Sequence, residues 1–370
     1  MLWFAYVIFL TLFLSSGFFK LKRGRLAFLI FSIAFLTFLA GGRMDYGVDY
    51  DEYRKIFEDV PCLNEFFGSD ALTDIHGEYF FLLLCSVLKS IGLSFEGFSL
   101  VFALLSVFIT VYAFNKFGWG VTVAVLLYFS HNYFLKEMGQ IRNGLSSAIL
   151  LMAFYYLKNF ENKKYFFSVV LASLIHSAAL VFLLAHFIIK RSFYSLFALL
   201  AFAFVLGFVG WLDMALGLVG QYLPERLSDY IGTDYYSNIG LSNPQTVKQM
   251  AFCILFFLIF DEFSKNKKIS NDMAVVSLGY TVKIYMASVF FLLIFVEFDL
   301  LARRMASYFA IVEPIIMAQC LYLFAAIGER RRYFLLMAFV FLYATVSIFF
   351  NVSFREGFDG VYKNWMLEGV

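Results

Sequence analysis

Long apolar runs separated by short polar segments dominate this chain. Hydrophobic residues make up 62% of its 370 residues, and 51 of them are phenylalanine. The runs are continuous rather than alternating, which excludes a transmembrane β-barrel. Runs of about 17–25 apolar residues match the length of a membrane helix, so we predict an all-α, polytopic transmembrane bundle of about 11–12 helices, some short or broken.

Charge is distributed unevenly between the polar segments. Basic residues gather in short segments, which the positive-inside rule places in the cytoplasm. These are Lys20–Arg25, Lys116, Lys158–Lys164, Lys190–Arg191, Lys265–Lys268 and Arg330–Arg332. Two polar segments are acidic: 42–77 holds nine Asp and Glu against three Lys and Arg, and 212–247 holds four against one. We expect both on the opposite, periplasmic side.

All the basic segments can lie in the cytoplasm only if two apolar segments are not ordinary single-pass helices. Glu78–Gly92 is short and contains Lys89, so we expect it to lie along or dip into the outer face. We expect Tyr165–Ile189 to form a broken pair of short helices that bends near His176. The chain is then one integral membrane domain, 1–370, with periplasmic loops at 42–97 and 212–247.

The polar cluster around Arg142 is the strongest candidate site. A guanidinium at membrane depth costs about 2.5–3.5 kcal/mol, so it usually faces a partner, a cavity or a substrate. Its planar fork suits phosphate oxygens, and Gln140 and Asn143 lie beside it. The alternatives are that Arg142 snorkels to the interface, or pairs with a carboxylate for structural reasons.

Three further groups of polar residues face the same predicted side. His176 lies among small residues, which equally suits a histidine packed in a helix interface. In the segment 42–53, Asp45, Asp49 and Tyr53 recur at helical spacing, as do Tyr46, Tyr50 and Tyr53, which fits an interfacial helix or a solvated acidic loop. The third group is Arg303 and Arg304, which could contact a phosphate or pair with Glu297 or Asp299.

Common cofactor and nucleotide motifs are missing from the sequence. We find no metal motif, P-loop, dinucleotide fingerprint or serine triad. The chemistry that we expect is therefore metal-independent, without a cofactor and without a nucleic-acid partner. Tyrosines in 212–247 could stack on sugar rings or anchor a loop to the membrane.

Three segments together resemble the EpsG-like family of Wzy-type polysaccharide polymerases. Arg43 followed by Gly47–Tyr53 resembles the family's Arg…Gly-x-Asp-Tyr-x-x-Tyr segment. Gln140–Leu145 resembles its Gln-x-Arg-Gln-Gly element, with Asn143 where Gln is usual, and His176–Leu180 resembles its His-x-Ser-Ala motif, shifted by one residue. The match in order and spacing covers roughly residues 40–190.

The resemblance implies a bacterial inner-membrane enzyme with a GT-C-like architecture and a periplasmic active site. Such enzymes join oligosaccharide units carried on undecaprenyl diphosphate into O-antigen, capsule or exopolysaccharide. The implied partners are that substrate, membrane lipids, a flippase and a chain-length regulator.

These residues can be assigned roles in such a reaction. We expect Arg142 to stabilise the leaving diphosphate, and His176 or Asp49 to act as the base. The expected substrate contacts are Arg43, Asp45, Tyr50, Tyr53, Gln140, Asn143, Arg303 and Arg304. Two other functions use the same features: a GT-C glycosyltransferase or O-antigen ligase with a lipid-linked donor, and a non-enzymatic transporter of lipid-linked glycans.

Overall fold

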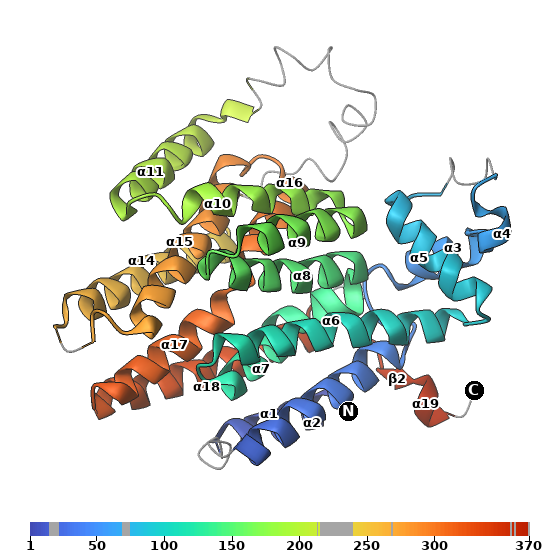
Figure 1. Cartoon of the computed structure of the whole chain (residues 1–370), viewed down its shortest axis with the longest axis horizontal. Coiled ribbons are helices and arrows are strands. Elements are labelled where there is room, and N and C mark those ends of the chain that lie inside the picture. Colours follow the sequence, from blue (N-terminus) through green and yellow to red (C-terminus); the bar gives the residue numbers. More distant parts are fainter. Residues whose placement is uncertain are drawn as a thin grey trace. The chain divides into compact units, whose positions relative to one another are not determined.

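The computed structural model describes residues 1–14, 22–68, 75–212, 214, 240–267, 269–355, 357–358 and 360–368. These residues are almost wholly helical, which confirms the all-α prediction (Figure 1). Most of the predicted loop 212–247, with its tyrosines, lies outside the described residues. The chain forms two compact units, Met1–Leu180 with Met317–Val370 (unit 1) and Val181–Ile316 (unit 2), and each is described by itself.

Unit 1 contains the N-terminal half of the chain and its C-terminal end. Its elements in chain order are α1 (Leu2–Leu14), α2 (Lys22–Gly41), β1 (Arg43–Met44), α3 (Tyr50–Asp59), α4 (Leu63–Phe66), α5 (Tyr79–Ser90), α6 (Phe95–Phe117), α7 (Val121–Leu127), the π-helical stretches η3 (Tyr128–Asn132) and η4 (Phe134–Gly139), α8 (Ile141–Lys158), α9 (Asn162–Ile175), most of α17 (Glu313–Ala326), α18 (Arg330–Ser353), β2 (Lys363–Asn364) and α19 (Trp365–Glu368). The 3₁₀ helix η5 (Ser177–Leu184) begins in unit 1 and continues into unit 2.

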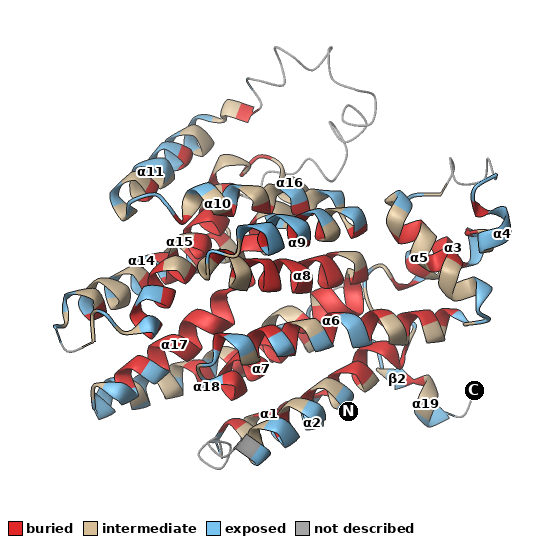
Figure 2. Ribbon diagram, in the orientation of Figure 1, coloured by how far each residue is buried: buried red, intermediate tan, exposed pale blue. Residues whose placement is uncertain are grey.

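Helix α8 lies in the core of unit 1. It packs against α6 and α9, and it is buried along most of its length (Figure 2). Small residues permit the close approach of α8 to the preceding chain: a Cβ at Gly144 would lie 2.3 Å from the carbonyl oxygen of Lys136. The polar start of α8 is therefore held between other elements rather than exposed.

Several helices are suited to cross a membrane. Among the described residues, five are long and apolar enough: Arg23–Gly41, Phe95–Phe117, Met273–Ile294, Asp299–Ala326 and Arg330–Ser353. Further apolar helices are shorter, and α5 is one of them. With 12 residues, α5 is about 18 Å long and cannot span the ~30 Å hydrocarbon core. The chain is thus a multi-pass membrane protein, and the placement of Glu78–Gly92 at the outer face stays a prediction.

The segment that precedes the long helix α6 forms a small helical cluster. Figure 1 shows α3, α4 and α5 grouped beside the start of α6. Lys89 fastens α5 to the end of α3, because its ammonium donates to the carbonyl oxygens of Glu58 at 2.5 Å and Val60 at 2.7 Å. Terminal carbonyls of a helix need such donors, which explains a lysine in this apolar segment.

Residues near the C-terminal end of unit 1 clamp the loop after α2. Strands β1 and β2 pair antiparallel, Tyr46 Oη donates to the carbonyl of Phe358 at 2.9 Å, and Trp365 Nε1 donates to that of Gly41 at 3.1 Å. Gly47 has φ +125°, and a Cβ there would lie 2.1 Å from the carbonyl oxygen of Met138. Only glycine fits such a position, so the start of α3 is pressed against the chain that leads into α8.

Unit 2 is built around one buried helix. Its helices are the end of η5, α10 (Ala185–Ile188), α11 (Phe193–Val209), α14 (Pro244–Lys265), α15 (Met273–Ile294), α16 (Asp299–Ala310) and the first turn of α17. Helix α15 contacts α10, α11, α14 and α16. Asp272 caps α15 by accepting from the Ala274 N–H at 2.7 Å, which satisfies one of the free N–H groups at its start.

Candidate functional site

One carboxylate in unit 1 gathers donors from two other parts of the chain. Glu78 Oε2 accepts from Arg142 Nη1 at 3.0 Å. Its Oε1 lies 2.8 Å from His176 Nδ1, 2.9 Å from the backbone N of Ser177 and 3.2 Å from Ser177 Oγ. The side chains of Arg142, His176 and Glu78 are 12%, 15% and 19% exposed. We call Glu78, Arg142, His176 and Ser177 the Glu78 cluster.

Helix ends place all members of this cluster. Glu78 immediately precedes α5 and makes no capping bond to it, so its carboxylate is available to other elements. Arg142 lies in the first turn of α8, where the helix dipole favours negative charge. Helix α9 ends at Ile175, and the extended backbone of His176 breaks the helix at the position predicted for the bend in Tyr165–Ile189. That break turns the Ser177 N–H towards Glu78.

Glu78 stays ionised over a wide range of pH. Burial raises its pKa, but hydrogen bonds from His176 and Ser177 and the attraction of His176 and Arg142 outweigh burial and lower the pKa from 4.5 to about 2. An ionised carboxylate can only accept hydrogen bonds, so His176 must donate through Nδ1. A neutral imidazole in that tautomer carries its lone pair on Nε2 and can take up a proton there.

Aromatic rings flank the guanidinium of Arg142. Its Cζ lies 5.6 Å from the ring centroid of Tyr53 and 5.3 Å from that of Phe81. Both distances suit cation–π attraction. Tyr53 is one of the residues predicted from the sequence, and the structure brings it to Arg142. Phe81 is on α5, one turn after Glu78.

A buried polar network supports the start of α8. Lys136 Nζ donates to Asn143 Oδ1 at 3.3 Å and to Ser147 Oγ at 2.5 Å. Asn143 Nδ2 donates in turn to Gln140 Oε1 at 3.0 Å. Asn143 is only 4% exposed, so its side chain holds Lys136, Ser147 and Gln140 together. The roles of Gln140 and Asn143 as substrate contacts stay predictions.

The residues of 42–53 lie in different surroundings. Arg43 is 1% exposed, and its Nη1 donates to the carbonyl of Ala40 and to Ser99 Oγ. Asp45, with φ +47°, forms an exposed ion pair with Arg54 at 3.5 Å. Asp49 immediately precedes α3, and Tyr50 is buried in α3 with its hydroxyl 3.2 Å from Arg54 Nη2. Their assignment to a substrate stays a prediction.

Arg303 and Arg304 belong to unit 2. Both lie within α16, which begins at Asp299, and Arg303 Nε donates to Asp299 Oδ1 in the pairing foreseen as the structural alternative. Glu297 is 3% exposed and accepts from the Leu212 N–H at 2.7 Å. The proposed role of the two arginines at a phosphate therefore stays a prediction.

Sequence reasoning missed Glu78 as a member of the site. It lies 64 residues before Arg142 and 98 before His176, and next to an acidic segment it looks like one more solvated carboxylate. An arginine at membrane depth needs a partner, and this need was the one feature of the sequence that could have pointed to a nearby carboxylate such as Glu78. Within the described residues, no group of three His, Cys, Asp or Glu could hold a metal ion. The cluster presents a guanidinium, an imidazole and a carboxylate, and their role at a substrate stays a prediction.

Comparison with known proteins agrees with these features. The chain is 24% identical over 302 residues to the amylovoran biosynthesis protein AmsC of Erwinia amylovora, covering 79% of this chain and 77% of that protein. No solved structure matches it. The model of the EpsG family matches residues 26–362, a range that contains the Glu78 cluster and β1 and ends just before β2. The chain therefore belongs to the EpsG family.

Proposed function

We propose that this protein polymerises oligosaccharide repeat units carried on undecaprenyl diphosphate, at the periplasmic face of the bacterial inner membrane. Membership of the EpsG family and similarity to an amylovoran biosynthesis protein support a role in making exopolysaccharide. The observation that carries the proposal is the Glu78 cluster. It combines a cation for an anionic leaving group with a histidine whose tautomer is set by a carboxylate.

In the proposed reaction, a hydroxyl of the acceptor unit attacks the anomeric carbon of the donor sugar. A new glycosidic bond forms while the bond between that carbon and the diphosphate oxygen breaks. The hydroxyl proton passes to His176 Nε2, and Glu78 stabilises the resulting imidazolium through Nδ1–H. The electron pair leaves with the lipid diphosphate, whose negative charge Arg142 stabilises.

The site fits this division of roles physically. Diphosphate is a stable anion, so its departure needs a fixed cation more than a proton donor. Arg142 is held between Glu78, Tyr53 and Phe81, so little reorganisation is needed when the charge develops. His176 is hydrogen-bonded to a carboxylate that remains ionised, which orients the ring and fixes its tautomer.

A comparison of two histidines tests the proposal. His176→Gln and the matched control His186→Gln would be expressed in a strain that lacks this gene. His186 lies outside the cluster, on α10, with its Nε2 2.7 Å from Lys190 Nζ. Polymer length would be read from gels, and unpolymerised repeat units from extracted lipids. We expect His176→Gln to abolish long polymer and accumulate single lipid-linked units, and His186→Gln to behave as the wild type.

The outcome separates the competing functions. Full-length polymer from His176→Gln at wild-type abundance would refute the assignment of the base. Accumulation of single units on the cytoplasmic side would indicate a transporter instead. Normal polymer that is not attached to its final acceptor would indicate a ligase.

A further inference from the structure

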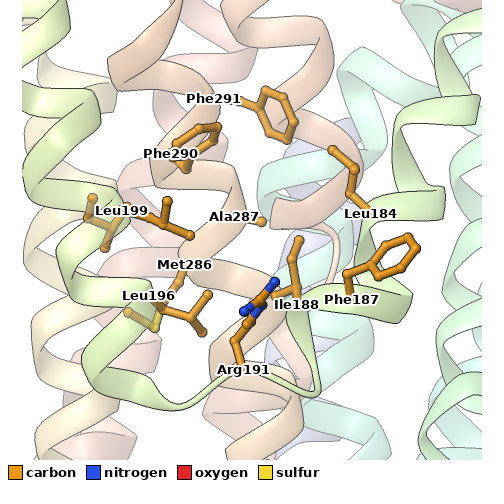
Figure 3. A pocket seen from close by; sticks show the side chains of 11 residues that line it. Leu184, Phe187, Ile188, Arg191, Leu196, Leu199, Met286, Ala287, Phe290 and Phe291 are labelled. Carbon is orange, nitrogen blue, oxygen red and sulfur yellow. The ribbon is translucent and has the colours of Figure 1, made fainter.

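An apolar groove lies within unit 2 and shares no residue with the Glu78 cluster. Its volume is about 200 Å³. Its lining residues come from η5, α10, α11, α15 and the turn between α10 and α11, which supplies Arg191, the only charged one among them (Figure 3). They are Leu184, Phe187, Ile188, Arg191, Leu196, Leu199, Leu200, Met286, Ala287, Phe290 and Phe291.

The groove is accessible from outside the protein. Leu184, Phe187 and Leu199 expose 45%, 61% and 46% of their surface, whereas Ala287 at its base is 6% exposed. An apolar cavity of roughly 150 Å³ is enough to bind a benzene ring. One turn of a helix about 11 Å wide occupies roughly 500 Å³, so the groove suits a hydrocarbon chain rather than a helix.

Charge is concentrated at one end of the groove. Figure 3 shows Arg191 at one end of the lining side chains and Phe290 and Phe291 at the other. Lys190 adjoins Arg191, and Lys283 Nζ donates to the carbonyl of Ile189 at 3.0 Å. In the part of the chain that the structure describes, Arg191 forms no ion pair.

We propose that this groove binds one acyl chain of an anionic membrane phospholipid, with the lipid phosphate at Arg191. The apolar wall excludes sugars and other polar ligands, which would lose hydrogen bonds to water without replacement. The cations at residues 190, 191 and 283 complement a phosphate, as basic pockets of membrane proteins do for lipid head groups. The positive-inside rule places Lys190–Arg191 in the cytoplasm, so the lipid belongs to the cytoplasmic leaflet.

Photochemical labelling tests this lipid site. The full-length protein would be placed in phosphatidylcholine nanodiscs that contain phosphatidylglycerol with a diazirine on its acyl chain. We expect label on peptides that contain Leu184–Leu200 and Met286–Phe291, and we expect unlabelled phosphatidylglycerol, but not phosphatidylcholine, to compete it away. Arg191→Gln should weaken labelling about fivefold, the effect of one cation near a membrane surface.

Two further variants sharpen the test. Arg331→Gln removes a cation from another predicted cytoplasmic segment and should leave the labelling unchanged. Ala287→Phe should fill the groove and remove label from these peptides. If Ala287→Phe fails to fold, Arg191→Gln still decides, because Arg191 is exposed. Equal labelling of wild type and Arg191→Gln, or competition by a polyprenyl phosphate and not by phosphatidylglycerol, would overturn the proposal.

Discussion

The substitution Glu78→Gln is the most direct probe of the candidate site. The amide keeps the shape of the side chain and can still accept a hydrogen bond from His176, but it removes the charge that faces Arg142. The lowering of the Glu78 pKa from 4.5 to about 2 means that the folded protein stabilises the ionised form over the protonated form by about 3 kcal/mol. We therefore expect the free energy of unfolding to fall by about 2–3 kcal/mol at neutral pH.

The pH dependence of this loss has a definite sign. The pKa of Glu78 is lower in the folded state than its ordinary value of 4.5, so its contribution to stability is fully present above pH 4.5. It is lost progressively as the pH falls from 4.5 through about 2, and below that pH the carboxyl is protonated in both states. The stability difference between wild type and Glu78→Gln should therefore be constant from pH 7 to pH 5 and shrink below about pH 4.

Unfolding of the purified protein in mixed micelles, titrated with SDS, measures this difference. Glu161→Gln is the matched control, because Glu161 pairs with Lys164 on an exposed surface. Exposed pairs contribute about 0–1 kcal/mol, so this control should change stability little. If Glu78→Gln unfolds like the wild type at pH 7, or if its deficit persists unchanged in acid, the reasoning about the Glu78 cluster is wrong.

Two other predictions concern the loop after α2 and the arginines of unit 2. Gly47→Ala should lower the free energy of unfolding by well over the ~1–2 kcal/mol that a left-handed backbone costs, because the new Cβ would collide with Met138, and less folded protein should be found in membranes. Gly92 also has a positive φ, +86°, but has open space around it. A loss as large in Gly92→Ala would therefore contradict the role of the collision. Arg303→Gln breaks only the partly exposed pair with Asp299 and should change stability by less than about 1 kcal/mol. If Arg303 contacts diphosphate, polymer output should nevertheless fall severalfold, and unchanged output would exclude it from the site.

The helical membrane fold and the break at His176 could be predicted from the sequence. Long apolar runs allow only helices, because a membrane offers no water to backbone groups. The basic segments could reach one side only if Tyr165–Ile189 was interrupted, and α9 does end at Ile175. In both cases a requirement on the whole chain, that backbone groups be paired in the membrane or that basic segments lie on one side, determined the local structure.

The pairing of individual polar side chains could not be predicted in the same way. The contact between Glu78 and Arg142 depends on how three helix ends meet, which no periodicity of the sequence encodes. Arg43 and Asp45 lie close together in the segment predicted to bind substrate. Arg43 is nevertheless buried against Ser99, whereas Asp45 is exposed beside Arg54. Residue type indicated the chemistry, and tertiary packing determined the environment.

The clamp between β1 and β2 has a consequence for biosynthesis. Unit 1 is assembled from Met1–Leu180 and Met317–Val370, so the ribosome must finish most of the chain before Phe358 and Trp365 can bind the loop around Tyr46. Domains usually fold during synthesis from the N-terminus. A nascent chain released early would carry Gln140, Arg142 and His176 but lack the residues that fix the start of α3, so premature termination should yield inserted but incompletely assembled protein.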